Sequence, residues 1–188
     1  MDATTMKQAC DATDAVIARI SGEQLDRPTP CAGWSVRDLL NHVVGTLHLG
    51  AALLSDTAPT VAMGPGELPP DDLVGGDPLT AYRAGVVGLL AAADGGGLDR
   101  SHATPLGDMP GFVLGGFTTL DIAVHGWDLA VATSQPDPLD ATLVEAVDAF
   151  ARQTITADTR APRIGPELPA PADASPSARL AAFLGRQA

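Results

Sequence analysis

The feature that most constrains the fold is a largely apolar run from Phe117 to Ala132 that carries three chemically active side chains. Asp121, His125 and Asp128 follow one another at intervals of four and three residues, so in a helix they share one face. Burying two carboxylates and an imidazole is costly unless something pairs with them, and a divalent cation is a suitable partner. The run therefore predicts a central, buried helix. Its polar face either binds a metal ion or consists of Asp and His side chains that bond one another, other protein groups or solvent.

The composition indicates one folded domain of ordinary size. The 188 residues are 45% hydrophobic and 18% charged. The net charge is −12, which argues against a basic surface. We therefore expect no nucleic-acid and no membrane partner. Two cysteines are too few for a disulfide scaffold, the N-terminus is polar and acidic, and no apolar run reaches the length of a membrane span. These features predict a single cytoplasmic domain over residues 1–188, either a monomer or a homodimer.

Helical periodicity recurs along the chain, and strand-like alternation of useful length is absent. Ser35 and Asp38 match a capping box, and Asp77 followed by Pro78 is a typical helix start. The expected helices span residues 2–20, 35–54, 77–93, 113–134, 139–156 and 175–184. We therefore predict an all-α fold, a four-helix bundle with an extra C-terminal helix and an irregular tail, residues 158–188, packed on it.

The second expected helix places His42 within its apolar part. Taken alone, such a histidine is more often a satisfied core residue than a metal ligand. Bundles build metal sites from inward side chains on facing helices, however, so His42 can join Asp121 and His125. Two imidazoles and one carboxylate suit zinc, and also nickel, iron or manganese, and three protein ligands leave positions open for a substrate. Trp34 and Trp127 lie near these residues in the sequence, and we expect them to pack around the site and exclude water.

Four other features are less directly connected with chemistry. His48 falls roughly on the opposite side of the second helix, and His102 lies in a polar connector where we expect it at the surface. Cys31 precedes a helix start, where the pKa of a thiol falls, but no histidine is close to it in the sequence, so we favour a structural role. The Pro/Gly/Asp-rich segment 56–77 is either a flexible excursion or the cover of a site.

Four segments carry a resemblance to a known family. They are Thr29–His42, with its Cys-Ala-Gly-Trp-Ser-Val-Arg-Asp core, Pro105–Gly111, Val124–Ala130, with its His-Gly-Trp-Asp motif, and the tail Asp173–Arg186. Together they resemble the actinobacterial metal-binding proteins related to mycothiol-dependent maleylpyruvate isomerase. These proteins belong to the DinB-like superfamily of four-helix bundles, and the match extends over nearly the whole chain.

The resemblance implies a bundle in up, down, down, up order with a divalent metal ion on its long inner helices. From the donor set we expect this ion to be zinc, with nickel as the next candidate. His42 corresponds to the first ligand histidine, Asp121 to the acidic ligand and His125 to the second histidine. Asp128 corresponds to an acid that lies beside the metal in the isomerases and assists catalysis.

Two departures separate this chain from the isomerases. The acidic ligand, Asp121, stands where the isomerase has the longer Glu. The isomerases also have a C-terminal domain that contributes an arginine to the active site, and this chain is too short for it. Arg179 and Arg186 in the tail are the candidates to replace that arginine.

Together these observations predict a metal- and thiol-dependent enzyme. A thiol that coordinates a metal ion loses its proton, so the site would activate a low-molecular-weight thiol such as mycothiol. We expect a transferase or isomerase that acts on a small electrophile, with Asp128 either accepting a proton or orienting His125. The alternative is a non-catalytic module that binds a metal or small molecule at the same site. In a third arrangement no metal binds, and the three candidate ligands bond one another in the core.

Overall fold

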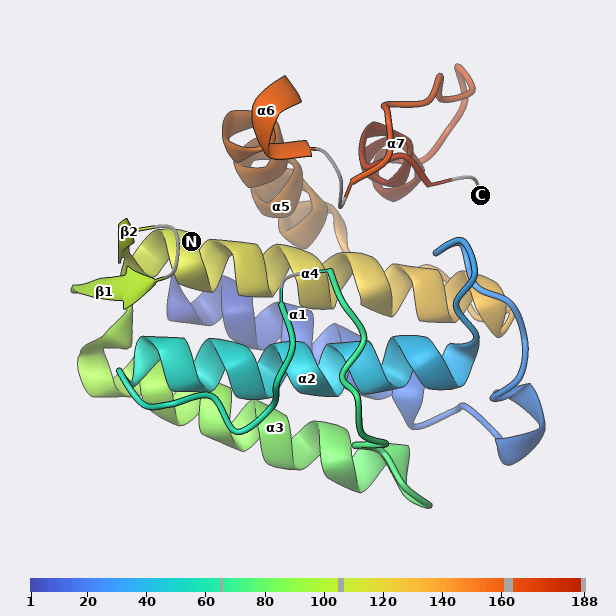
Figure 1. Cartoon of the computed structure of the whole chain (residues 1–188). Coiled ribbons are helices and arrows are strands. Elements are labelled where there is room, and N and C mark those ends of the chain that lie inside the picture. The colour runs from blue at the N-terminus through green and yellow to red at the C-terminus, as the bar shows by residue number, and fades with distance from the viewer. Residues whose placement is uncertain (65, 105–106, 161–163, 187–188) are drawn as a thin grey trace.

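Long helices make up most of the structure (Figure 1). The computed structural model describes residues 1–64, 66–104, 107–160 and 164–186. Its helices are α1 (Ala3–Ile17), α2 (Val36–Leu54), α3 (Pro78–Ala92), α4 (Gly111–Ala132), α5 (Ala141–Thr154), α6 (Ala157–Arg160) and α7 (Pro176–Phe183), with short helical turns η1 (Gly22–Gln24) and η2 (Ala93–Gly97). Each helix that the sequence predicts is present, with its ends shifted by a few residues.

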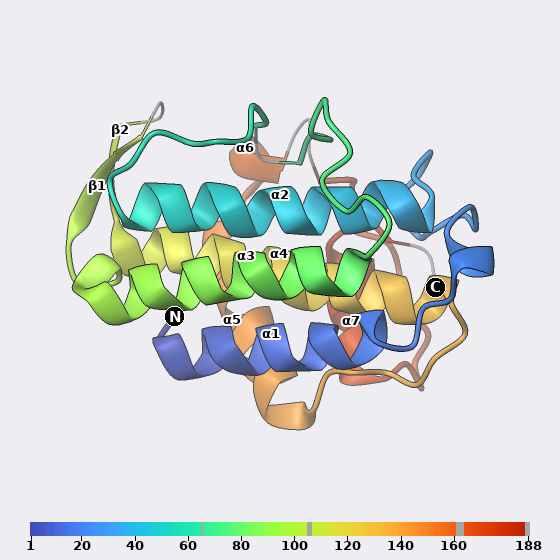
Figure 2. The ribbon, with the colours of Figure 1, turned by 90° about the horizontal axis from the view of Figure 1, so that it is seen from below.

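Helices α1 to α4 lie side by side and enclose the core. α1 packs on α3 and α4, and α2 packs on the same two helices. Figure 2 shows that α1 and α4 run in one direction and that α2 and α3 run in the other. The second and fourth predicted helices therefore face each other, as expected. α5 packs on α4 and α1, and α7 packs on α5, so these later helices cover the side of α4 that faces away from α2 (Figure 1).

Side-chain caps explain where the bundle helices begin. At the start of α2, the amide of Asp38 donates to Oγ of Ser35 over 3.2 Å, and the Asp38 carboxylate accepts from the Ser35 amide over 2.9 Å. At the start of α3, Asp77 accepts from the amide of Thr80 over 3.1 Å, and Pro78 occupies a position where a helix needs no amide donor. Among the described residues, no helix is both long and apolar enough to cross a membrane.

The expectation of a purely helical chain was wrong at one place. Strands β1 (Ser101–Thr104) and β2 (Gly107–Pro110) pair in antiparallel register between η2 and α4. Strands of four residues are too short for alternating hydrophobicity to be recognised in a sequence. Pro105 and Leu106, which belong to the second family-like segment, lie outside the described residues.

His102 on β1 is buried, with 2% of its surface exposed, and not at the surface as predicted. Its Nδ1 lies 2.7 Å from a carboxylate oxygen of Asp56, and its Nε2 lies 2.7 Å from the carbonyl oxygen of Gly97. These partners compensate for the loss of water around the ring. Asp56 is remote in the sequence, so the polar character of the connector alone suggested exposure.

Candidate metal centre

The structure brings together the three residues that the sequence predicted as metal ligands. Asp121 and His125 lie one turn apart on α4, and His42 faces them from α2. His42 Nε2 is 3.2 Å from Asp121 Oδ2, and His125 Nε2 is 3.4 Å from Asp121 Oδ1. The three residues offer one ligand atom each within 4.8 Å of one another, a spacing that one metal ion can bridge.

Both histidines donate their Nδ1 proton to a group outside the set of three candidate ligands. His42 Nδ1 is 2.7 Å from the carbonyl oxygen of Glu67, and His125 Nδ1 is 2.9 Å from Oδ2 of Asp128. Carbonyl and carboxylate oxygens only accept hydrogen bonds, so each ring donates through Nδ1. A neutral ring then carries its lone pair on Nε2, and both Nε2 atoms face the same Asp121 carboxylate.

Asp121 has one oxygen without a hydrogen-bond partner. Oδ2 is buried, and His42 Nε2 approaches it to 3.2 Å without hydrogen-bond geometry, so among the described residues no donor satisfies it. Two imidazole lone pairs and an unsatisfied carboxylate oxygen converge at this point. Such a set of acceptors requires a positive charge between them, either a metal ion or protons.

In the metal-free protein a proton supplies that charge. Burial alone would disfavour an imidazolium, but the Asp121 carboxylate outweighs it and raises the pKa of His125 well above its usual range. Burial alone would likewise raise the pKa of Asp121, but His125 and His42 beside it hold that pKa well below its usual range. Without a metal ion, the site is therefore an ion pair between the His125 imidazolium and the Asp121 carboxylate. A divalent cation that bound to these residues would displace the proton.

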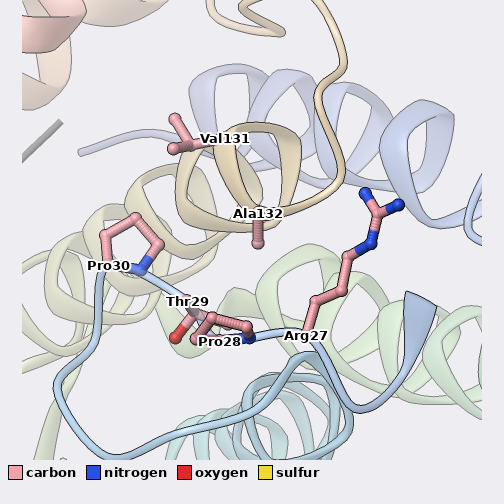
Figure 3. A pocket seen from close by; sticks show the side chains of 6 residues that line it. All are labelled: Arg27, Pro28, Thr29, Pro30, Val131 and Ala132. Carbon is pink, nitrogen blue, oxygen red and sulfur yellow. The ribbon is translucent and has the colours of Figure 1, made fainter.

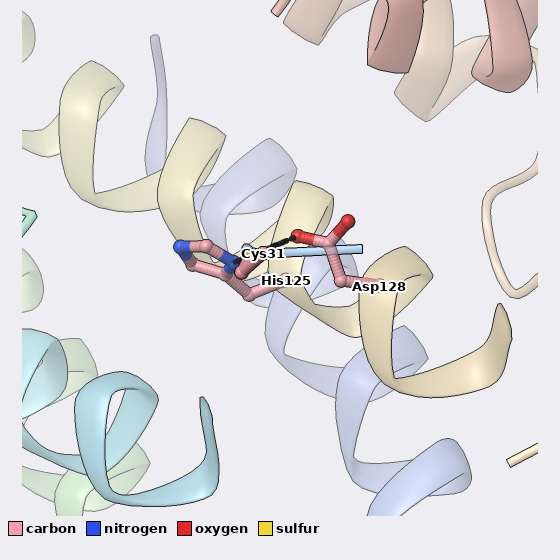
Figure 4. A group of neighbouring side chains, drawn as sticks. All are labelled: Cys31, His125 and Asp128. Carbon is pink, nitrogen blue, oxygen red and sulfur yellow. Dashed lines mark hydrogen bonds and ion pairs between the residues drawn. The ribbon is translucent and has the colours of Figure 1, made fainter. Parts of the chain in front are cut away.

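Asp128 links the candidate ligands to the C-terminal tail. It is fully buried, and Arg186 Nε donates to its Oδ2 over 2.8 Å and to its Oδ1 over 3.1 Å. Cys31 Sγ donates to the same Oδ2 over 3.2 Å (Figure 4). Burial would raise the pKa of Asp128, but the Arg186 charge and the hydrogen bond from His125 lower it. Asp128 is therefore an ionised acceptor that orients His125.

Cys31, His125 and Asp128 form a second cluster with the spacing of metal ligands (Figure 4). Cys31 Sγ is 3.7 Å from His125 Nδ1 although 94 positions separate the two residues, so the sequence-based reason for giving Cys31 a purely structural role does not hold. The Arg186 guanidinium already supplies positive charge here, with Nη2 3.5 Å from His125 Nδ1. Among the described residues, no Lys or Arg side chain forms an ion pair with the His42, Asp121 and His125 cluster.

The two tryptophans and the two tail arginines named in the sequence analysis differ in their distance from the site. The ring of Trp34 is 4.9 Å from the His42 ring and 6.3 Å from the His125 ring, measured between centroids. Trp127 is buried in the core. Arg179 donates to the carbonyl oxygen of Ala174, so of the two tail arginines it is Arg186 that reaches the site.

The segment between α2 and α3 supplies a partner that sequence reasoning missed. Within residues 56–77, the backbone carbonyl of Glu67 contacts His42, one of the candidate ligands. Glu67 acts through its backbone carbonyl, so its residue type gives no indication of this role.

A hollow of about 340 Å³ lies between the connector before α2 and the C-terminal end of α4 (Figure 3). It is lined by Arg27, Pro28, Thr29, Pro30, Val131 and Ala132. Pro30 adjoins Cys31 in the chain, and Val131 lies about one helical turn beyond Asp128. None of the three candidate ligands lines the hollow.

Comparison with known proteins found matches over most of the chain. Residues 6–130 match the family model described as the mycothiol maleylpyruvate isomerase N-terminal domain. Two proteins described as uncharacterized, from Mycobacterium tuberculosis strains CDC 1551 and H37Rv, are each 36% identical to the chain over 183 residues. Each alignment covers 96% of this chain and 94% of the relative. No solved structure matches the chain.

Proposed function

Because the chain belongs to the family of the mycothiol maleylpyruvate isomerase N-terminal domain, we propose that it binds a divalent metal ion and uses it in thiol-dependent chemistry. His42, Asp121 and His125 are the proposed ligands, on a bundle of DinB-like type. The helix order of up, down, down, up in α1 to α4 supports this assignment of the fold (Figure 2).

The orientation of the two imidazoles is the main support for the proposal. Both imidazoles donate their Nδ1 protons away from the site, to Glu67 and to Asp128, and turn their Nε2 atoms toward Asp121. Partners that fix the tautomer in this way are typical of histidines that bind metal ions. The buried, unpartnered oxygen of Asp121 adds negative charge at the point where the two Nε2 atoms converge.

The donor set favours zinc, with nickel as the next candidate. Asp121 is shorter than the glutamate of the isomerases, yet its oxygens come within 3.2 and 3.4 Å of the two Nε2 atoms. One carboxylate leaves a bound divalent ion with a net charge of about +1, which favours an anionic ligand in the remaining coordination positions.

A bound zinc ion would lower the pKa of a coordinated thiol, so that the thiol is present as a nucleophilic thiolate. Asp128 would hold the Nδ1 proton of His125 and keep its Nε2 directed at the site. Arg186 would keep Asp128 ionised, and Trp34 would exclude water from one side of the two imidazoles. We propose a mycothiol-type thiol as the cosubstrate and a small electrophile as the substrate, in a transferase or isomerase reaction.

A specific observation supports a second candidate, a non-catalytic module that binds a metal or small molecule. His125, Arg186 and Cys31 all contact the Asp128 carboxylate, so Asp128 has little capacity left to act as a general base. In this module the metal site would hold a ligand without transforming it.

Metal content is the primary test. Plasma mass spectrometry on tag-free protein should find near-stoichiometric metal, and the double variant His42→Ala/His125→Ala should lose it while remaining folded by circular dichroism. His48→Ala, on the same helix but outside both clusters, is the matched control and should keep the metal. Parent protein that stays metal-free after incubation with zinc, nickel and manganese would refute the proposal.

A second assay separates the two candidates. The rate at which mycothiol or a simpler thiol adds to an electrophilic test compound would be compared between zinc-loaded protein and an equal concentration of free zinc. Faster addition with the protein supports the enzyme, and equal rates support the binding module.

A further inference from the structure

The segment 66–75 lies along α2 and reaches the candidate metal centre. In Figure 1 it descends from the side of α4, crosses α2 and leads into α3. Arg37 and Asn41, one turn apart on α2, form hydrogen bonds with the C-terminal half of this segment. Arg37 Nη1 donates to Asp72 Oδ2 over 3.3 Å and to the carbonyl oxygen of Gly75 over 3.1 Å.

Asn41, one helical turn after Arg37, makes the more buried attachment. Its Oδ1 accepts from the amide of Leu73 over 2.6 Å and from the amide of Val74 over 3.2 Å. Its Nδ2 donates to the carbonyl oxygen of Arg37 over 3.2 Å, which fixes the orientation of the carboxamide. Asn41 has 9% of its surface exposed, so water is a poor substitute for these partners.

A further turn along α2, Gly45 allows the chain to approach closely. A Cβ at this position would collide with Sδ of Met63, whose side chain fills the space that the glycine leaves. Positions 37, 41 and 45 therefore form one stripe of α2 on which the segment and the residues just before it rest.

The same segment contacts the residue next to Asn41. The carbonyl oxygen of Glu67 accepts the Nδ1 proton of His42 over 2.7 Å. Pro69 and Pro70 lie between Glu67 and the part that Asn41 holds, and they restrict the backbone there. Leu68 precedes a proline and is biased toward extended conformations. A short stretch of chain, restricted at Pro69 and Pro70, thus connects the attachment at Asn41 to the hydrogen bond at His42.

We infer that Asn41 is a positioning residue for the metal centre, which acts through segment 66–75 to hold the Glu67 carbonyl against Nδ1 of His42. This hydrogen bond keeps the Nδ1 proton in place, so that Nε2 carries the lone pair that faces Asp121. The expected effect on metal affinity rests on the proposed function. The protection of His42 Nδ1–H by the segment does not depend on a metal ion.

Two readouts on the full chain test this inference. The first is the solvent exchange rate of the His42 Nδ1 proton in the metal-free protein, measured by NMR with ¹⁵N-labelled histidine. The second is the zinc dissociation constant from competition with a chromogenic chelator. In Asn41→Ala we expect exchange at least about 10-fold faster and zinc binding weaker by about 10- to 100-fold, the usual range for lost supporting partners of a ligand.

Conservative and control variants separate positioning from general damage. Asn41→Asp keeps an acceptor for the amides of Leu73 and Val74 but loses the donor to the Arg37 carbonyl, so both readouts should lie between those of Asn41→Ala and the parent. Asp71→Asn, at an exposed position of the same segment, should change neither. If Asn41→Ala does not fold, Arg37→Ala, which removes the exposed attachment, should shift both readouts in the same direction by a smaller factor.

Folded Asn41→Ala with parental exchange and parental zinc affinity would overturn the inference. A parent protein that binds no metal but loses His42 Nδ1–H protection in Asn41→Ala would refute the proposed function and support the positioning by Asn41. The two failures are therefore distinguishable.

Discussion

The guanidinium of Arg186 lies against the carboxylate of Asp128, with Nε 2.8 Å from Oδ2 and 3.1 Å from Oδ1, although 58 positions separate the two residues. Asp128 is fully buried and the Arg186 side chain is 16% exposed. Because Asp128 also accepts the Nδ1 proton of His125, this ion pair connects the C-terminal tail to a proposed metal ligand.

Removing Arg186 should destabilise the protein because it leaves a buried carboxylate without its cation. For Arg186→Ala we expect a loss of about 3 kcal/mol in the free energy of unfolding, measured by urea denaturation of metal-free protein. Arg179→Ala, an exposed arginine of the same tail, is the control and should lose much less. Equal stabilities of the two variants would show that the pair with Asp128 contributes little.

The stability of the metal-free protein should fall as the pH rises above neutrality. The Asp121 carboxylate raises the pKa of His125 well above its ordinary value of 6.5, so the folded state retains a proton that the unfolded state loses. This contribution is complete below pH 6.5 and disappears as the pH rises through the raised pKa. Melting temperatures measured from pH 6 to 9 should decline in the parent and in His48→Gln, and more weakly in His125→Gln.

Zinc affinity should change in the opposite direction over the same pH range. Zinc requires an unprotonated Nε2 on His125, so binding releases the proton that stabilises the metal-free state. Competition with a chelator should therefore give tighter zinc binding at pH 8 than at pH 6.5. Affinity that is independent of pH would contradict the assignment of His125 as a ligand.

The two cysteines should differ in reactivity. Burial, with a smaller contribution from the charge of Asp11, raises the pKa of Cys10 to about 12, whereas Cys31 is half-buried beside Asp128. A thiol reacts as the thiolate, so a disulfide reagent at pH 8 should modify Cys31 in the native protein and reach Cys10 only after denaturation. Cys31→Ser should then abolish the native reaction, and Cys10→Ser should leave it. Fast modification of Cys10 in the native Cys31→Ser variant would contradict this account.

His102 should contribute to stability through its two hydrogen bonds. His102→Ala removes the donors to Asp56 and to the Gly97 carbonyl in a buried position, and we expect a loss of about 2 to 3 kcal/mol. Urea denaturation measures this, with His48→Ala as the control on a half-buried histidine. A loss no greater than that of the control would mean that water replaces both partners.

The helices were predictable because their determinants are local. Apolar periodicity and the caps at Ser35 and Asp77 depend on residues within a few positions of one another, and the helices begin where these caps indicated. The strand pair β1 and β2 was missed because pairing between four-residue strands leaves too short a pattern in the sequence. His102 was misplaced because its carboxylate partner, Asp56, is distant along the chain.

The amino-acid sequence by itself determined the helical segments, the shared face of Asp121, His125 and Asp128, and the choice of His42 as their partner. Helical geometry sets the first two, and the tendency of bundles to place polar ligands on facing helices suggested the third. The packing of distant segments decided the rest, because the direction in which a ring nitrogen points depends on what contacts its other nitrogen. The Glu67 carbonyl and the Arg186–Asp128 pair reach the site through space, and they determine which atoms of His42 and His125 remain free.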